Sequence, residues 1–174
     1  MKKKLIYSIF GFIVIFGCSQ VEISNAKSFE IPKRNHDLSF TPFDKSIDDS
    51  SFEVCDSTSI TSGRNRLQYS DGRDRLTNDI KTLYKFKENY RSYSGYIVIR
   101  FISNCKGQIG RYRLESLGND LLPQEAPPGL IADLRNLSKS LTKWDKRGGP
   151  ENNQEYSKFI NLKFENGELQ HVLL

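Results

Sequence analysis

The sequence predicts an α+β domain in which two helices pack on one face of a small antiparallel sheet. Two stretches of the chain carry apolar residues at helical spacing, and three others are rich in β-branched and aromatic residues. Glycine, proline and asparagine separate these stretches, as expected for turns. The resulting order of helix, strand, strand, helix and strand is typical of a two-layer domain around one hydrophobic core.

The first helix is predicted from Asp74 to Glu88, where apolar residues recur every three or four positions. Asp71 or Asp74 could cap its amino-terminal end. The predicted core face of this helix consists of Leu76, Ile80, Leu83 and Tyr84.

A β-hairpin is predicted next. Its first strand runs from Gly95 to Ser103 and places Ile97, Ile99 and Phe101 on one face. The turn contains Asn104 and Gly107, and glycine suits a left-handed backbone there. The second strand runs from Gln108 to Ser116, and Gly110 could mark a bulge in it.

Pro123, Pro127 and Pro128 interrupt a loop, and the second helix is predicted to begin there, with Pro128 just before or at its first turn. Gly148, Gly149 and Pro150 cannot continue it. Its apolar stripe consists of Leu130, Leu134, Leu137, Leu141 and Trp144. Because Trp144 lies on this stripe, it is expected to pack in the core rather than to bind a ligand.

A third strand is predicted from Tyr156 to Phe164. The dipeptide Asn166-Gly167 that follows is the strongest short signal for a hairpin. Residues 168–174 could therefore form a last short strand.

The amino-terminal residues indicate export. Three lysines precede an apolar run from Leu5 to Phe16, and Gly17-Cys18 follows. This run is short for a bilayer span, and the layout is typical of a cleaved signal peptide. Residues 15–18 resemble a bacterial lipobox, which implies cleavage before Cys18 and acyl chains on its thiol. The alternative is an uncleaved amino-terminal membrane helix.

The predicted organisation has three parts: a signal peptide over residues 1–17, a lipidated flexible tether over 18–51 and the folded domain over 52–174. By analogy with enterobacterial lipoproteins, Ser19 favours the outer membrane, with the domain in the periplasm. Without the three lysines of the signal, 23 basic residues face 21 acidic ones, a net charge of about +2. This charge is too small to predict a nucleic-acid partner.

Two cysteines remain when Cys18 carries lipid. An even pair in an oxidising compartment predicts a disulfide between Cys55 and Cys105, and two buried free thiols are the alternative. His36 and His171 have no metal-ligand spacing to either cysteine, so neither a metal nor another cofactor is expected. The sequence also contains no catalytic motif, and we expect no enzyme activity.

The order and spacing of these elements resemble the TonB C-terminal domain, roughly from Arg73 to Phe164. The residues that carry the resemblance are Gly95, Ile97, Ile99, Phe101, Asn104, Gly107, Ile109, Leu141, Trp144, Lys158, Ile160, Leu162 and Phe164. The stretch from Phe101 to Gly107 is similar to that of Bacteroidetes lipoproteins with this domain. A lipid anchor and a tether with only Pro32 and Pro42 differ from the uncleaved helix and proline-rich spacer of TonB, so the resemblance does not imply energy transduction.

The resemblance implies that the last strand of the domain pairs with a partner segment as an edge strand. The candidate residues are Tyr156, Lys158, Ile160, Leu162 and Phe164. Alternatively, the hairpin at Asn166-Gly167 covers this edge. A second candidate site consists of Arg64, Arg66, Arg73 and Arg75, which could bind a lipid phosphate or a carboxylate; the alternative is a solvated loop and helix start.

The sequence therefore predicts a non-catalytic binding module, anchored by lipid in the cell envelope, that recognises an envelope protein. The alternative is a structural accessory lipoprotein of an outer-membrane transport, secretion or motility complex. An unrecognised envelope enzyme is the third reading.

Overall fold

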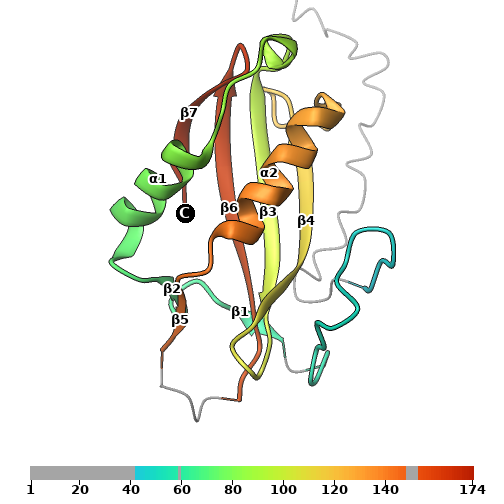
Figure 1. Ribbon diagram of the computed structural model, residues 1–174, viewed down its shortest axis with the longest axis vertical. Helices are drawn as coiled ribbons and strands as arrows, with labels where there is room; N and C mark the ends of the chain where they lie inside the picture. The colour runs from blue at the N-terminus through green and yellow to red at the C-terminus, as the bar shows by residue number, and fades with distance from the viewer. Residues whose placement is uncertain (1–41, 59, 148–152) are drawn as a thin grey trace, which may run out of the picture. The chain divides into compact units, whose positions relative to one another are not determined.

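The computed structural model describes residues 42–58, 60–147 and 153–174 (Figure 1). The predicted signal peptide, Cys18 and most of the predicted tether lie outside these ranges. The elements in chain order are β1 (Thr61–Ser62), β2 (Leu67–Tyr69), α1 (Gly72–Leu83), the 3-10 turn η1 (Glu88–Tyr90), β3 (Gly95–Ser103), β4 (Ile109–Leu117), α2 (Pro128–Ser140), β5 (Trp144–Lys146), β6 (Tyr156–Glu165) and β7 (Glu168–Leu173).

Five strands form one sheet with the order β1-β6-β3-β4, and β7 also pairs with β6. β3 pairs antiparallel with both β4 and β6, and β7 is antiparallel to β6. The short strand β1 runs parallel to β6, which makes the sheet mixed rather than purely antiparallel. β2 and β5 form a separate antiparallel ribbon. The predicted α+β class is confirmed.

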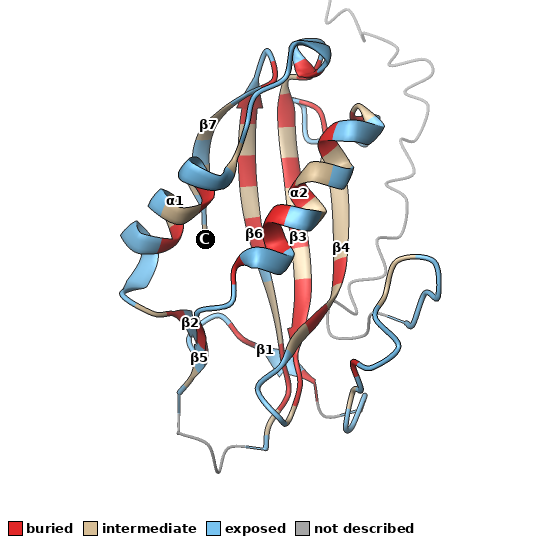
Figure 2. Cartoon of the chain, viewed as in Figure 1, coloured by how far each residue is buried: buried red, intermediate tan, exposed pale blue. Residues whose placement is uncertain are grey.

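Both helices bury their apolar sides against the same face of the sheet (Figure 2). This core contains Leu76 and Ile80 from α1, Leu130, Leu134 and Leu137 from α2, Ile97, Ile99 and Phe101 from β3, and Ile160, Leu162 and Phe164 from β6. A second, smaller cluster contains Phe52, Ile60 and Ile102. Because neighbouring residues of a strand point to opposite faces, Ile102 lies on the face away from Phe101 and the helices.

The hairpin of β3 and β4 matches its prediction closely, but its irregularity lies one residue beyond the expected position. The register shifts between Arg100 and Ile102 of β3. Arg111 in β4 has a φ of 54°, in the left-handed region. Gly110 instead provides space for the ring of Phe52, which an added Cβ would approach to 2.5 Å.

Helix α1 ends at Leu83 rather than at Glu88. Tyr84 is extended, with φ −65° and ψ 131°. Its ring packs against Phe164 with 5.5 Å between centroids, and its hydroxyl donates a hydrogen bond to the carbonyl of Gly167. The partly buried Tyr84 therefore packs against the core from an extended residue just after the helix.

Helix α2 ends at Ser140, so the prediction that Trp144 lies on this helix is wrong. The hydroxyl of Ser138 donates to the carbonyl of Leu134, and that of Ser140 donates to the carbonyl of Leu137, both at 2.7 Å. Such bonds compete with helical ones and favour a helix end. Trp144 lies in β5 opposite Tyr69 and is only 8% exposed. It is therefore buried as predicted, although it belongs to a strand and not to the helix.

The predicted turn at Asn166-Gly167 is confirmed. Both residues have positive φ, 50° and 76°, as a two-residue hairpin loop of this type requires. The amide of Gly167 also donates to the carbonyl of Tyr93 at 2.8 Å. This turn returns the chain as β7 alongside β6.

Candidate functional site

A short gap in the strand pairing along β6 marks the candidate site. β1 pairs only with Tyr156 and Ser157, whereas the pairing of β7 reaches no further than Asn161. In the part of the chain that the structure describes, residues 158–160 therefore have no strand neighbour on this side of β6. The other side of β6 is paired with β3 throughout these residues.

The turn after β1 produces this gap. The amide of Gly63 donates to the carbonyl of Ser157 at 2.7 Å, and an added Cβ would lie 3.0 Å from the same oxygen. A glycine therefore suits this close approach. The carbonyl of Gly63 accepts from the amide of Leu67 at 2.9 Å, which closes a tight turn and carries Arg64 away from β6.

Main-chain groups of β6 face the gap at one position. The amides of Thr61 and Gly63 donate to the carbonyls of Glu155 and Ser157. Alternate residues of a strand direct their main-chain groups to the same side. Phe159 therefore turns its N–H and C=O into the gap, and its side chain is also exposed.

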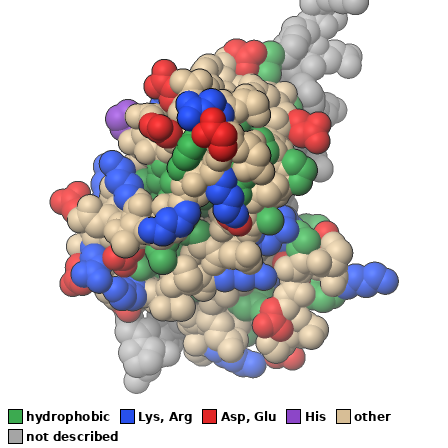
Figure 3. Space-filling model, turned by 45° about the horizontal axis from the view of Figure 1, so that its top comes forward, with side chains coloured by type: hydrophobic (Ala, Val, Ile, Leu, Met, Phe, Trp, Pro, Cys, Tyr) green, Lys and Arg blue, Asp and Glu red, His purple; other side chains and the backbone are tan. Residues whose placement is uncertain are grey.

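A groove of about 390 Å³ opens at this gap, between the turn over residues 63–67, the start of α1 and β6. Its polar lining consists of three cations, Arg64, Arg73 and Lys158, and four uncharged residues, Ser62, Asn65, Gln68 and Ser157. No acidic side chain is among the described residues that line it. On the face shown in Figure 3, basic and acidic side chains are mixed. The purely basic charged lining of the groove therefore differs from the mixed charge of that face.

Lys158 is the half-buried cation of the groove. Its Nζ donates to the carbonyls of Leu67 at 2.7 Å and Arg64 at 3.3 Å, and lies 6.0 Å from the centroid of the Trp144 ring. Burial, and to a smaller extent the positive charge of Arg73, lower the pKa of Lys158. Within the described residues this ammonium has neutral acceptors but no carboxylate partner.

The four arginines predicted to bind an anion separate into two pairs. Arg64 and Arg73 line the groove, and Arg73 donates to the main-chain oxygen of Leu174 at 3.2 Å. Arg66 and Arg75 do not line it, and Arg75 forms an ion pair with Asp79 at 2.9 Å. The structure thus brings together half of the predicted set and adds Lys158.

The floor of the groove is aromatic and well anchored. Tyr69 and Trp144 meet edge to face with 5.1 Å between ring centroids, and Phe101 lies 4.8 Å from Trp144 on the core side. The Tyr69 hydroxyl donates to Asp79 at 2.8 Å. Burial, together with this bond and the charge of Asp79, raises the pKa of Tyr69 to about 12, so the hydroxyl stays protonated.

The prediction that the third strand is a free edge is wrong for most of its length. β6 lies inside the sheet, with β3 on one side and β1 and β7 on the other. Of the predicted contact residues, Tyr156, Ile160, Leu162 and Phe164 are buried in the core, and only Lys158 reaches the groove. The alternative, that the hairpin at Asn166-Gly167 covers this edge, holds from Asn161 onward.

Cys55 and Cys105 form a disulfide with 6.1 Å between their Cα atoms. It joins the segment before β1 to the turn of the β3–β4 hairpin. The nearly fully buried carboxylate of Glu155 supports the same segment, because it accepts from the amides of Cys55 at 2.7 Å and Asp56 at 2.9 Å. Sequence reasoning missed this role of Glu155, since its partners lie far away along the chain.

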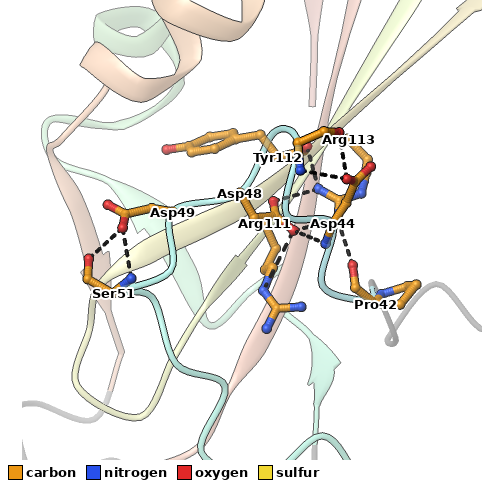
Figure 4. A network of polar contacts seen from close by, with 9 residues as sticks. Pro42, Asp44, Asp48, Asp49, Ser51, Arg111, Tyr112 and Arg113 are labelled. Atoms are coloured by element: carbon orange, nitrogen blue, oxygen red, sulfur yellow. Dashed lines mark hydrogen bonds and ion pairs between the residues drawn. The ribbon is translucent and has the colours of Figure 1, made fainter.

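Residues 42–52, which we call the strap, lie along β4 rather than forming a free tether (Figure 4). Arg113 holds the carboxylate of Asp48 through two bonds of 2.8 and 2.7 Å and also donates to the carbonyl of Pro42. Arg111 lies 3.9 Å from the same carboxylate, and the side chain of Asp48 is only 2% exposed. Described residues ahead of the predicted domain start at Phe52 therefore contact β4.

We expect acid to weaken this strap. Burial alone would raise the pKa of Asp48, but hydrogen bonds from Arg113 and the Asp44 amide, with the charges of Arg113 and Arg111, outweigh it and hold the pKa below 3.8. The stabilisation is complete above the unfolded pKa and is lost as pH falls through the lower, folded pKa. The stability difference between wild type and Asp48→Asn, from denaturant titrations, should therefore shrink as the pH falls below the ordinary aspartate pKa of about 4. A difference that does not change with pH would contradict this account.

No helix in the described part of the chain has the length and apolar character needed to cross a bilayer. His171 is exposed on β7, whereas His36 lies outside the described ranges. In the same ranges, no three His, Cys, Asp or Glu side chains gather as a metal site would require.

Comparisons with protein-family models, with curated proteins and with solved structures found no match to this chain. The resemblance to the TonB C-terminal domain therefore stays a prediction from the sequence.

Proposed function

We propose that this chain is a non-catalytic binding module, anchored by lipid at Cys18 in the bacterial envelope, that holds a protein partner at the groove beside β6. The observation that supports this site is the gathering of Arg64, Arg73 and Lys158 at a gap in the sheet. None of the three pairs with an Asp or Glu side chain among the described residues, and Arg73 donates to the main-chain oxygen of Leu174 at 3.2 Å. The anchor, the periplasmic side and the outer membrane rest on the sequence pattern alone.

A partner segment in the groove can pair with only a short part of β6. An extended partner segment could meet the N–H and C=O of Phe159, where β6 has no strand neighbour on this side. It could not run along the whole strand, because β7 occupies the positions from Asn161 onward. Side-chain contacts in the groove are therefore expected to contribute more to affinity than main-chain pairing does.

Reversing one charge in the groove should reduce partner capture. We expect Arg64→Glu in the full chain to lower the amount of cross-linked envelope partner at least about tenfold, which corresponds to about 1.4 kcal/mol. Quantitative mass spectrometry after cross-linking and purification measures this.

The matched control is Arg66→Glu, which makes the same charge change in the same turn outside the groove. It should capture the wild-type amount. Equal capture by Arg64→Glu and wild type would exclude the groove as the partner site, and equal losses in both variants would indicate only a general charge effect.

A further inference from the structure

We propose that the groove binds an acidic side chain on an extended polypeptide segment, with the carboxylate held by Arg64, Arg73 and Lys158. This inference rests on the proposed function, because it names the chemistry of the partner at the same site.

The charge of the lining is the first argument. Three cationic groups line a groove of about 390 Å³ that no described acidic side chain lines. Lys158 donates only to neutral carbonyls in this region and lies near the like charge of Arg73. A carboxylate entering here would receive charge-assisted hydrogen bonds and would relieve this repulsion.

The start of α1 adds to the positive potential. Helix α1 begins at Gly72, which lines the groove, and no side chain caps its first turn. The amides of a first turn carry a partial positive charge. This effect supports the three side chains and does not by itself define the site.

The shape of the groove favours a side chain over a membrane surface. Its volume lies at the lower end of the range of pockets for small ligands. Its floor, formed by Tyr69 and Trp144, is almost fully buried, so a ligand must insert to contact it. A flat bilayer could contact the rim, where Arg64 is exposed, but could not reach half-buried Lys158.

The uncharged polar groups beside the three cations favour a polypeptide as the ligand that carries the carboxylate. Phe159 presents one main-chain donor and one acceptor at the gap, and the amide side chains of Asn65 and Gln68 also line the groove. These groups match the N–H and C=O of a peptide on either side of an acidic residue.

The test uses the full chain and two pools of capped pentapeptides. Both pools have random flanking residues other than tryptophan, and the central residue is glutamate in one pool and glutamine in the other. Trp144 is the only tryptophan and lies on the groove floor, so its fluorescence reports binding, with equilibrium dialysis as an independent measurement. We expect the glutamate pool to bind wild type at least about tenfold more tightly than the glutamine pool.

This preference should disappear in Arg64→Gln with Arg73→Gln, and it should persist in the matched control Arg66→Gln. Thermal melting of each variant checks that the fold is intact. Equal binding of the two pools, or no binding of either, would overturn the inference, as would glycerol phosphate binding that requires Arg64 without any glutamate preference. If cross-linked partner capture still depended on Arg64 in that case, the proposed function would stand while its acidic ligand would be wrong. Glutamate preference with capture that ignores Arg64 would instead count against the proposed function.

Discussion

Replacing Leu134 by alanine should lower the free energy of unfolding by about 3 to 5 kcal/mol. Leu134 is fully buried in the middle of α2, within the cluster that joins both helices to the sheet. Truncation removes its apolar contacts and leaves a cavity that the surrounding side chains fill only in part. Denaturant titration followed by the fluorescence of Trp144 measures the change, because this ring packs against Phe101 in the same core.

Asn136→Ala is the matched control on the same helix. Asn136 is exposed, so its replacement should change stability by no more than about 0.5 kcal/mol. If Leu134→Ala and Asn136→Ala unfolded at the same denaturant concentration, α2 would not present the face that the structure gives it.

Removing the disulfide with Cys55→Ser and Cys105→Ser should lower the free energy of unfolding by about 4 kcal/mol. The bond joins residues separated by 50 positions, and opening a loop of this length increases the conformational entropy of the unfolded chain. Neither cysteine is fully buried, so serine fits at both positions. The same titration measures the loss.

A reducing agent provides the internal control. It should destabilise wild type and leave the double variant unchanged. Two free thiols on denatured, unreduced mature chain would show that the bond is absent. If wild type contains the bond but its removal lowers stability only a little, Glu155 and the strap hold the segment without it.

Much of the fold follows from local sequence because its causes are local. β3 matches its predicted bounds from Gly95 to Ser103, since alternating β-branched residues favour a half-buried strand wherever it pairs. Asn166 and Gly167 tolerate positive φ, so the last turn follows from two residues alone. The leucine stripe of α2 likewise predicts its buried face.

Element ends were less predictable, because distant residues decide them. Tyr84 and Trp144 continue the apolar spacing of their helices, yet both leave the helix to pack against other elements. Spacing alone cannot distinguish an apolar residue on a helix from one buried just after it. The prediction that β6 is an edge strand was wrong for the same reason, because segments elsewhere in the chain decide whether a strand has neighbours.

The candidate site shows this division most clearly. By itself the sequence determined the order of the two helices and the four longest strands, most of their apolar faces and the presence of arginine pairs beside Gly63 and Gly72. Only the tertiary structure decided that Arg64 and Arg73 share a groove with Lys158, whose ammonium bonds to a carbonyl 94 positions away. The physical reason is that a strand or helix forms from interactions over a few residues, whereas a binding surface forms where distant segments meet, here where β1 leaves β6 and α1 begins.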